Sequence, residues 1–176
     1  MDQNDFIALG NQDPPLRFLV IGGYAVLVHG HSRFTNDFDM MVRRADSEAW
    51  IERIKAAGMT LFSRTETFAQ FSQPRGEGLD LMFATDETFE ELWKSSIESS
   101  FDDSKARLPS LDHLLALKLH ALKHTQPHRT AKDMEDLEVL VRRNDVPLDS
   151  DRYRELFLKY GTQQIHDTLK RILRHS

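Results

Sequence analysis

The sequence predicts an α/β (α+β) fold, in which strands and helices alternate over the first 100 residues and helices follow from Thr88 onward. Two segments of the first half have the sequence patterns of β-strands. Residues 17–21 form a continuous apolar run of the kind buried on both faces of a sheet. Residues 79–83 alternate, with Leu79, Leu81 and Phe83 on one face and Asp80 and Met82 on the other. The second half shows apolar residues at helical spacing.

Helix-breaking and helix-capping residues predict where the remaining elements begin and end. Gly10 and the Asp-Pro-Pro run that follows end a short leading helix, and Gly58 closes a helix with Trp50, Ile51 and Ile54 at core spacing. Ser110 and Thr130 are expected to cap two long helices. The polar stretch 96–109 is expected to link the two halves. The predicted strands are 17–21, 38–42, 60–64, 68–72 and 79–83; the predicted helices lie within 1–14, 24–30, 47–57, 88–95, 110–123, 130–143, 151–160 and 162–174.

Composition bounds the function classes. A chain of 176 residues, 40% of them apolar, makes one domain or one domain with a helical extension. It has no cysteine, which excludes disulfides, zinc ribbons and thiol nucleophiles. We find neither a signal pattern nor an apolar run of membrane-spanning length, so a cytoplasmic protein without a membrane partner is the expectation.

Charge is divided unevenly between the two halves. Residues 1–103 hold 9 Lys and Arg against 18 Asp and Glu, whereas residues 104–176 hold 14 against 10. The basic half could meet a polyanion. A solvated helical surface explains the same surplus of four.

The stretch that carries the chemistry is a Gly-Gly pair followed by two carboxylates. Asp37 and Asp39 share one face of a predicted strand, since side chains at i and i+2 point the same way. Adjacent carboxylates repel unless a cation lies between them, and Mg²⁺ is the usual partner. Gly22 and Gly23 offer backbone N–H groups to a phosphate. A solvated edge and an ordinary tight turn are the alternative interpretations.

A third carboxylate lies in the apolar strand 79–83. Asp80 is unfavourable there unless something pairs with it. It is either an edge-strand charge that prevents aggregation or a third metal carboxylate beside Asp37 and Asp39.

The order and spacing of these residues resemble the first motif of the polymerase-β-like nucleotidyltransferases, which is Gly-Gly or Gly-Ser, about a dozen residues, and then Asp-x-Asp. The resemblance implies a small mixed sheet with flanking helices (residues 1–100) and a C-terminal helical bundle (residues 101–176) that closes the nucleotide cleft. It also implies that Asp37, Asp39 and Asp80 are catalytic and hold Mg²⁺, two ions being expected, with an NTP as substrate.

A second set of residues resembles the abortive-infection (AbiEii-type) toxin branch and related uncharacterised bacterial nucleotidyltransferases. It comprises Lys-x-x-Ala at Lys118 and Arg-x-x-Lys-Asp-x-x-Asp-Leu ending at Asp136-Leu137. The resemblance implies that Lys118, Lys132 and Asp133 bind the nucleotide, with Asp136 less firmly assigned. Snorkelling of Lys118, capping by Thr130 and Asp133, and an i, i+4 pair of Lys132 with Asp136 are the structural alternatives.

Function follows as three hypotheses. The first is a Mg²⁺-dependent nucleotidyltransferase that moves an NMP from an NTP to an acceptor hydroxyl, as a toxin with a cognate antitoxin and with tRNA or protein as acceptor. The second is a small-molecule enzyme of the aminoglycoside type. The third is a nucleotide- or partner-binding module without turnover. The sequence indicates neither the acceptor nor the oligomeric state.

Histidines add little to these hypotheses. His120 and His124 have metal-ligand spacing, and His113 lies roughly on the same face. No cysteine or carboxylate completes a zinc set, so a polar helix face is favoured. His29 and His31 could line the cleft or simply occupy a turn.

Overall fold

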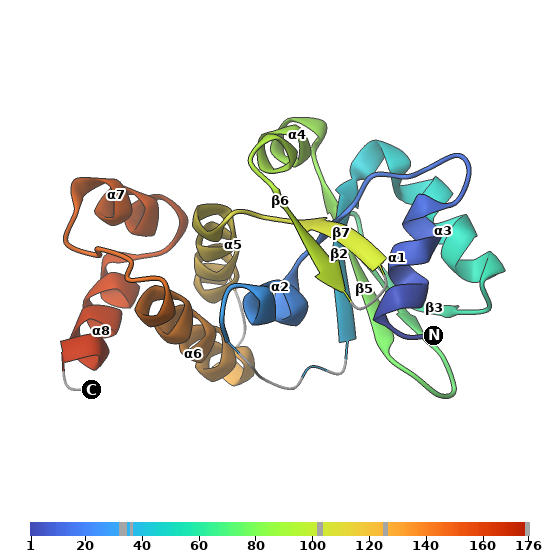
Figure 1. Cartoon of the computed structure of the whole chain (residues 1–176). Coiled ribbons are helices and arrows are strands. Elements are labelled where there is room, and N and C mark those ends of the chain that lie inside the picture. Colours follow the sequence, from blue (N-terminus) through green and yellow to red (C-terminus); the bar gives the residue numbers. More distant parts are fainter. Residues whose placement is uncertain (32–34, 36, 102–103, 125–126, 175–176) are drawn as a thin grey trace. The chain divides into compact units, whose positions relative to one another are not determined.

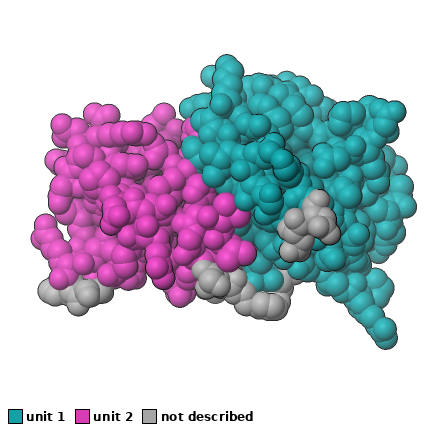
Figure 2. Space-filling view, viewed as in Figure 1, with its two compact units in different colours: residues 1–25, 33–110 teal, residues 26–32, 111–176 magenta. Residues whose placement is uncertain are grey.

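The computed structural model describes residues 1–31, 35, 37–101, 104–124 and 127–174. The chain forms two compact units, coloured separately in Figure 2. Unit 1 comprises Met1–Ala25 and Arg33–Ser110, and unit 2 comprises Val26–Ser32 and Leu111–Ser176. The domain boundary predicted between residues 100 and 101 stays a prediction.

Unit 1 is built on a five-stranded mixed sheet with the order β1-β2-β5-β4-β3 (Figure 1). Strands β2 and β5 run parallel, and the other neighbours are antiparallel. This sheet and the helices that follow it confirm the predicted α/β fold class. The strands are β1 Leu19–Val20, β2 Asp37–Arg43, β3 Thr60–Arg64, β4 Phe68–Ser72 and β5 Gly78–Ala84.

The two central strands follow the predicted alternation. On β2, Phe38 and Met40 are fully buried, whereas Asp37 is exposed and Asp39 half-buried. On β5, Leu79 and Leu81 are fully buried and Asp80 is half-buried. Burying these apolar side chains on one face fixes the strand register, because a slip of one residue would turn the carboxylates into the core.

Helices complete unit 1, and one of them shows how the core face is covered. Helix α1 begins with a capping box in which the Asp2 side chain accepts from the backbone N–H groups of Asn4 and Asp5. Its Phe6 ring stacks on Phe38 of β2, with ring centroids 5.5 Å apart. The helical segments are α1 Gln3–Asn11, α2 Gly22–Val28, the 3₁₀ turn η1 Arg44–Asp46, α3 Ser47–Ala56 and α4 Asp86–Lys94. Helix α2 belongs to unit 1 up to Ala25 and to unit 2 from Val26.

The predicted polar link at 96–109 is wrong. This stretch contains a two-stranded antiparallel hairpin, β6 Ile97–Phe101 and β7 Ser104–Leu108. Phe101, Ala106 and Leu108 are buried, and β7 adjoins β1 and α1. Only three inward apolar residues mark the hairpin, and neighbouring elements supply the rest of its burial.

Unit 2 is helical, and its core is formed by leucines with Phe157 and Val141. Its helices are α5 Leu111–His124, α6 Pro127–Arg143, α7 Asp151–Tyr160 and α8 Gln163–Arg174. Helix α6 begins at Pro127, so Thr130 lies within it and is not the predicted N-terminal cap. Helices α5 and α7 are joined by Tyr153, whose hydroxyl donates to Asp112 at 2.9 Å. None of the helices in the described residues is long and apolar enough to span a bilayer.

Candidate active site and nucleotide-binding residues

The parallel pair β2–β5 brings the three candidate carboxylates of unit 1 onto one face of the sheet. Asp39 and Asp80 are direct Cα partners in the register, and Asp37 pairs with Gly78. Because Asp37 and Asp39 are two residues apart, they point to the side opposite Phe38 and Met40. Asp80 points to that same side, as its in-register partner does.

The Gly-Gly turn lies against the Asp39 carboxylate. Gly22 has a φ of +60°, and a Cβ at this position would overlap the Asp39 carboxylate. A Cβ on Gly23 would lie 2.8 Å from Thr35 Oγ1. The turn is anchored to β2 by the Ile21 N–H, which donates to the Asp39 carbonyl at 2.9 Å. Glycine is therefore required at position 22 for backbone conformation and for close approach.

Gln70 is a functional candidate that the sequence interpretation missed. It is the β4 partner of Asp80, and its Nε2 lies 3.1 Å from Asp80 Oδ1 and 3.2 Å from Oδ2. An amide donor shared by both oxygens orients the Asp80 carboxylate and leaves it able to accept. The signal was the alternation of Ala69, Gln70 and Phe71, but the alternation alone does not reveal which residue of β5 faces Gln70.

Two further polar side chains of unit 1 adjoin Asp37 and were also missed. Thr35 Oγ1 donates to the Asp37 carbonyl at 3.1 Å. Glu77 precedes Gly78, the register partner of Asp37, and accepts from the Tyr24 hydroxyl at 2.7 Å. A Cβ on Gly78 would lie 2.6 Å from Asp37 Oδ1, so Asp37 rests on bare backbone. This close approach explains glycine at the start of β5.

In unit 2, Lys118 does not snorkel to solvent. It is 9% exposed, and its Nζ lies 2.9 Å from Asp133 Oδ1 and 2.6 Å from Asp136 Oδ2. Asp136 is fully buried, and His31 Nε2 lies 3.7 Å from its Oδ1. We call Lys118, Asp133, Asp136 and His31 the lysine–carboxylate cluster. The buried anion that a lysine in an apolar stripe requires is thus supplied by helix α6.

The other candidate residues considered in unit 2, which are Lys132, His120 and His124, are not members of this cluster. Lys132 is exposed on α6. The His120 and His124 rings lie against each other with centroids 4.4 Å apart and planes tilted by 48°. Burial of the His120 ring, followed by the charges of His124 and Lys123, lowers the pKa of His120.

The donor chemistry of the three carboxylates fits Mg²⁺, although they do not form a ready-made cluster. Across the part of the chain that the structure describes, no three His, Asp or Glu side chains converge as they would around a metal ion. Asp37, Asp39 and Asp80 nevertheless offer only oxygen atoms, on one sheet face and in adjacent register positions.

Comparison with solved structures defines the class to which this fold belongs. The antibiotic-resistance factor ANT(2'')-Ia, solved in complex with adenylyl-2''-tobramycin, superposes with a TM-score of 0.65 at 14% identity, covering 88% of this chain and 92% of that one. The lincosamide antibiotic adenylyltransferase LnuA, lincomycin-bound, gives 0.58 at 17% identity, covering 77% and 92%. An antigenic nucleotidyltransferase-like protein from Paracoccidioides brasiliensis gives 0.54 at 12% identity, covering 88% and 84%. The fold is that of the polymerase-β-like nucleotidyltransferases.

The family is narrower than the fold. The model of the nucleotidyl transferase AbiEii toxin of type IV toxin–antitoxin systems matches residues 8–175, so the chain belongs to the AbiEii family. This confirms the predicted family and implies an NTP substrate and a cognate antitoxin. No curated protein matches the chain.

Proposed function

We propose that this protein is a Mg²⁺-dependent toxin that transfers an NMP from an NTP to a hydroxyl of tRNA or protein. The observation that carries the proposal is the pairing of Asp39 with Asp80 on adjacent parallel strands, with the Asp39 carboxylate against Gly22. Within unit 1, carboxylates that can bind cations therefore lie beside a glycine backbone that can bind phosphate.

Asp37, Asp39 and Asp80 would hold the Mg²⁺ ions in this proposal. When bound, Mg²⁺ would neutralise triphosphate charge and polarise phosphoryl oxygens as a Lewis acid. Gln70 orients Asp80, which accepts the proton of the acceptor hydroxyl. The acceptor oxygen forms its bond to the α-phosphorus while the bond between that phosphorus and the β-phosphate oxygen breaks, and pyrophosphate leaves.

The glycine backbone of unit 1 and the lysine–carboxylate cluster of unit 2 are each proposed to bind phosphate oxygens. Gly22 and Gly23 lie in the first turn of α2, where helical geometry leaves N–H groups available to phosphate oxygens. Lys118 Nζ has three donors, of which Asp133 and Asp136 take two. The third donor is assigned to a phosphate oxygen, with Asp133 fixing the ammonium in place. Lys132, exposed on α6, is proposed as a second phosphate-binding cation of unit 2.

Label transfer tests the proposal directly. The protein is incubated with each α-³²P-labelled NTP, Mg²⁺, and total tRNA or a cell lysate, and labelled products are separated. We expect label on one macromolecule, dependence on Mg²⁺, and loss of transfer in Asp39→Asn and Asp80→Asn. Glu66→Gln, which changes an exposed carboxylate in the loop between β3 and β4, is the matched control and should retain transfer.

A small-molecule acceptor is the second candidate, favoured by the fold shared with ANT(2'')-Ia. Adding tobramycin to the same reaction separates the two: adenylylated tobramycin with unlabelled tRNA and protein would replace the toxin proposal. Tight NTP binding without any transfer would instead indicate a binding module.

A further inference from the structure

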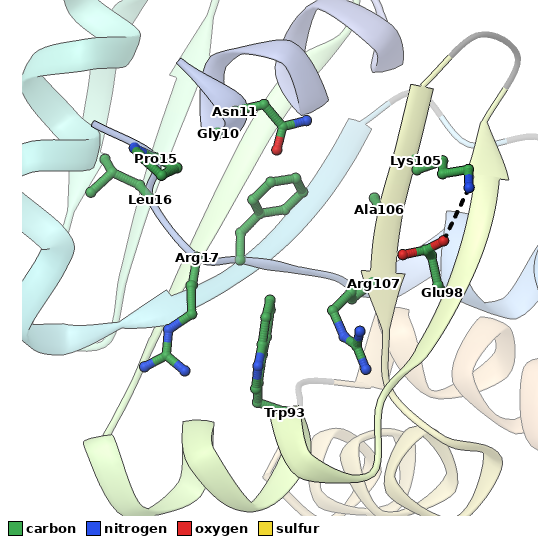
Figure 3. A pocket seen from close by; sticks show the side chains of 11 residues that line it. Gly10, Asn11, Pro15, Leu16, Arg17, Trp93, Glu98, Lys105, Ala106 and Arg107 are labelled. Atoms are coloured by element: carbon green, nitrogen blue, oxygen red, sulfur yellow. Dashed lines mark ion pairs between the residues drawn. The ribbon is translucent and has the colours of Figure 1, made fainter. Parts of the chain in front are cut away.

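Unit 1 contains a pocket that is distinct from the three carboxylates. It has a volume of about 270 Å³ and is lined by the segment before β1, the end of α4 and the hairpin β6–β7 (Figure 3). Leu16, Phe18 and Trp93 supply its apolar lining, with Phe18 only 6% exposed. Three cations complete the lining: Arg17, Lys105 and Arg107.

Trp93 and two arginines form one organised group in this pocket. Figure 3 shows Trp93 between Arg17 and Arg107, whose Cζ atoms lie 5.3 and 5.1 Å from its ring. Arg17 is held by Glu90 of α4 through both terminal nitrogens. Arg107 donates from Nε to Ser96 Oγ at 2.7 Å and from Nη2 to the Ser96 carbonyl at 3.0 Å. The guanidinium groups are therefore positioned before any ligand arrives.

The charge of the pocket is opposite to that of its surroundings. The lining has three cations and one carboxylate, Glu98, which pairs with Lys105 at 3.3 Å. Glu90 outside the lining pairs with Arg17, so one net positive charge remains, while residues 1–103 hold twice as many acids as bases. Arg107 uses Nε and Nη2 on Ser96, so the donors of its Nη1 remain for a ligand. A ligand with an anionic group next to an apolar part fits this lining.

We propose that this pocket binds one nucleotide unit, with its base on the apolar lining and its phosphate near Lys105 and Arg107. Aromatic side chains interleaved with arginines are the recurring chemistry of single-stranded nucleic acid sites. An acidic peptide would use the cations but not the apolar lining.

The position along the chain connects this pocket to the transfer reaction. Arg17 and Gly22 are separated by five residues of extended chain around β1, a span of about 16 Å. A single strand that places its terminal hydroxyl beside Asp80 could therefore place an earlier nucleotide in the pocket. This assignment of RNA as acceptor rests on the proposed function; binding of a nucleotide unit does not.

Binding without NTP or Mg²⁺ tests the inference. The anisotropy of a labelled single-stranded hexaribonucleotide is measured against protein concentration at several salt concentrations. Lys105→Gln, at a side chain that is 72% exposed, should weaken binding about fivefold and make the slope of log K against log salt shallower by about 0.7. Glu98→Gln should act in the opposite direction and tighten binding about threefold.

Controls separate this inference from the proposed function. Lys55→Gln, which removes another lysine of unit 1 paired with a glutamate, should bind as the wild type does. Asp39→Asn should lose transfer and keep oligonucleotide binding, so absence of transfer in the wild type would count against the proposed function alone. Competition by AMP as strong as that by unlabelled hexanucleotide would identify free nucleotide as the ligand. The inference is overturned if Lys105→Gln and Glu98→Gln both bind within twofold of wild type, or if a hexaglutamate peptide competes as well as the hexanucleotide.

Discussion

Asp80 is the register partner of Asp39 on one side and of Gln70 on the other, and Gln70 donates to both of its carboxylate oxygens. The Asp80 carboxylate is repelled by the neighbouring Asp39 carboxylate and is held in orientation by the Gln70 amide. A cation bound between the two carboxylates would remove the repulsion. The hydrogen bonds from Gln70 set the direction of the Asp80 lone pairs. The row Asp39–Asp80–Gln70 is thus arranged for a task other than sheet stability.

Replacing Gln70 should lower the affinity for Mg²⁺ while changing the free energy of unfolding little. Loss of such an orienting partner typically lowers metal affinity or activity about 10- to 100-fold, so Gln70→Ala should raise the Mg²⁺ concentration needed for half-maximal transfer by about tenfold. The measurement is label transfer across a Mg²⁺ titration. Gln164→Ala, an exposed glutamine on α8, is the control. An unchanged Mg²⁺ dependence in Gln70→Ala would show that the amide has no part in the site.

Gly22→Ala should destabilise the protein through collision with the Asp39 carboxylate. Gly58 is the matched control, since it also has positive φ (+94° against +60° at Gly22) but has open space where a Cβ would go. Left-handed conformation alone costs an alanine about 1–2 kcal/mol, which Gly58→Ala measures. Urea unfolding should show a loss at Gly22→Ala at least about 1 kcal/mol larger. Equal losses would mean that Asp39 moves aside freely.

The face of each strand that carries the carboxylates could be predicted from the sequence because side-chain alternation along a strand is a local property. Alternation on one strand is enough to place Asp37 and Asp39 together and to isolate Asp80 among apolar neighbours. It could not show that β2 and β5 are parallel neighbours, or that β4 supplies Gln70, because register depends on contacts between segments distant in sequence. The roles of these residues stay predictions.

Unit 2 shows the same division between local and long-range information. The apolar stripe of α5 predicted that Lys118 needs solvent or a buried anion, but the partner lies on α6. Its signal was present in the sequence: Asp133, Asp136, Leu137 and Leu140 share one helical face, which puts Asp136 in an apolar stripe. For the hairpin β6–β7, in contrast, the local sequence signal is weak. Its three buried side chains are too few to give a clear strand pattern.

The fold should lose stability as pH falls through the range in which histidine titrates, and His120 should contribute to this loss. Burial, and then the charges of His124 and Lys123, lowers the pKa of folded His120 below its ordinary value of 6.5. The unfolded chain therefore binds the proton first, so the contribution is complete above pH 6.5 and decreases as pH falls towards the lowered pKa.

Two-dimensional NMR of the imidazole signals would check this by direct titration. His124→Gln should raise the pKa of His120, since it removes one of the repelling charges. His120→Gln should make the urea midpoint fall less steeply between pH 7 and pH 5 than in the wild type. A His120 pKa at or above its ordinary value would contradict the expectation.

Breaking the lysine–carboxylate cluster should be far more damaging than breaking a surface ion pair. Lys118→Met leaves Asp136, which is 0% exposed, without its closest cation, and removing one member of a buried pair costs about 3–5 kcal/mol. Lys55→Met, whose partner Glu52 is exposed, should change the urea midpoint little. Lys118→Met/Asp136→Leu should recover much of the loss, because the uncompensated charge is gone. If the double variant is no more stable than Lys118→Met, the cost lies in packing. If it recovers stability yet binds NTP weakly, then Lys118 holds the nucleotide as well as the fold.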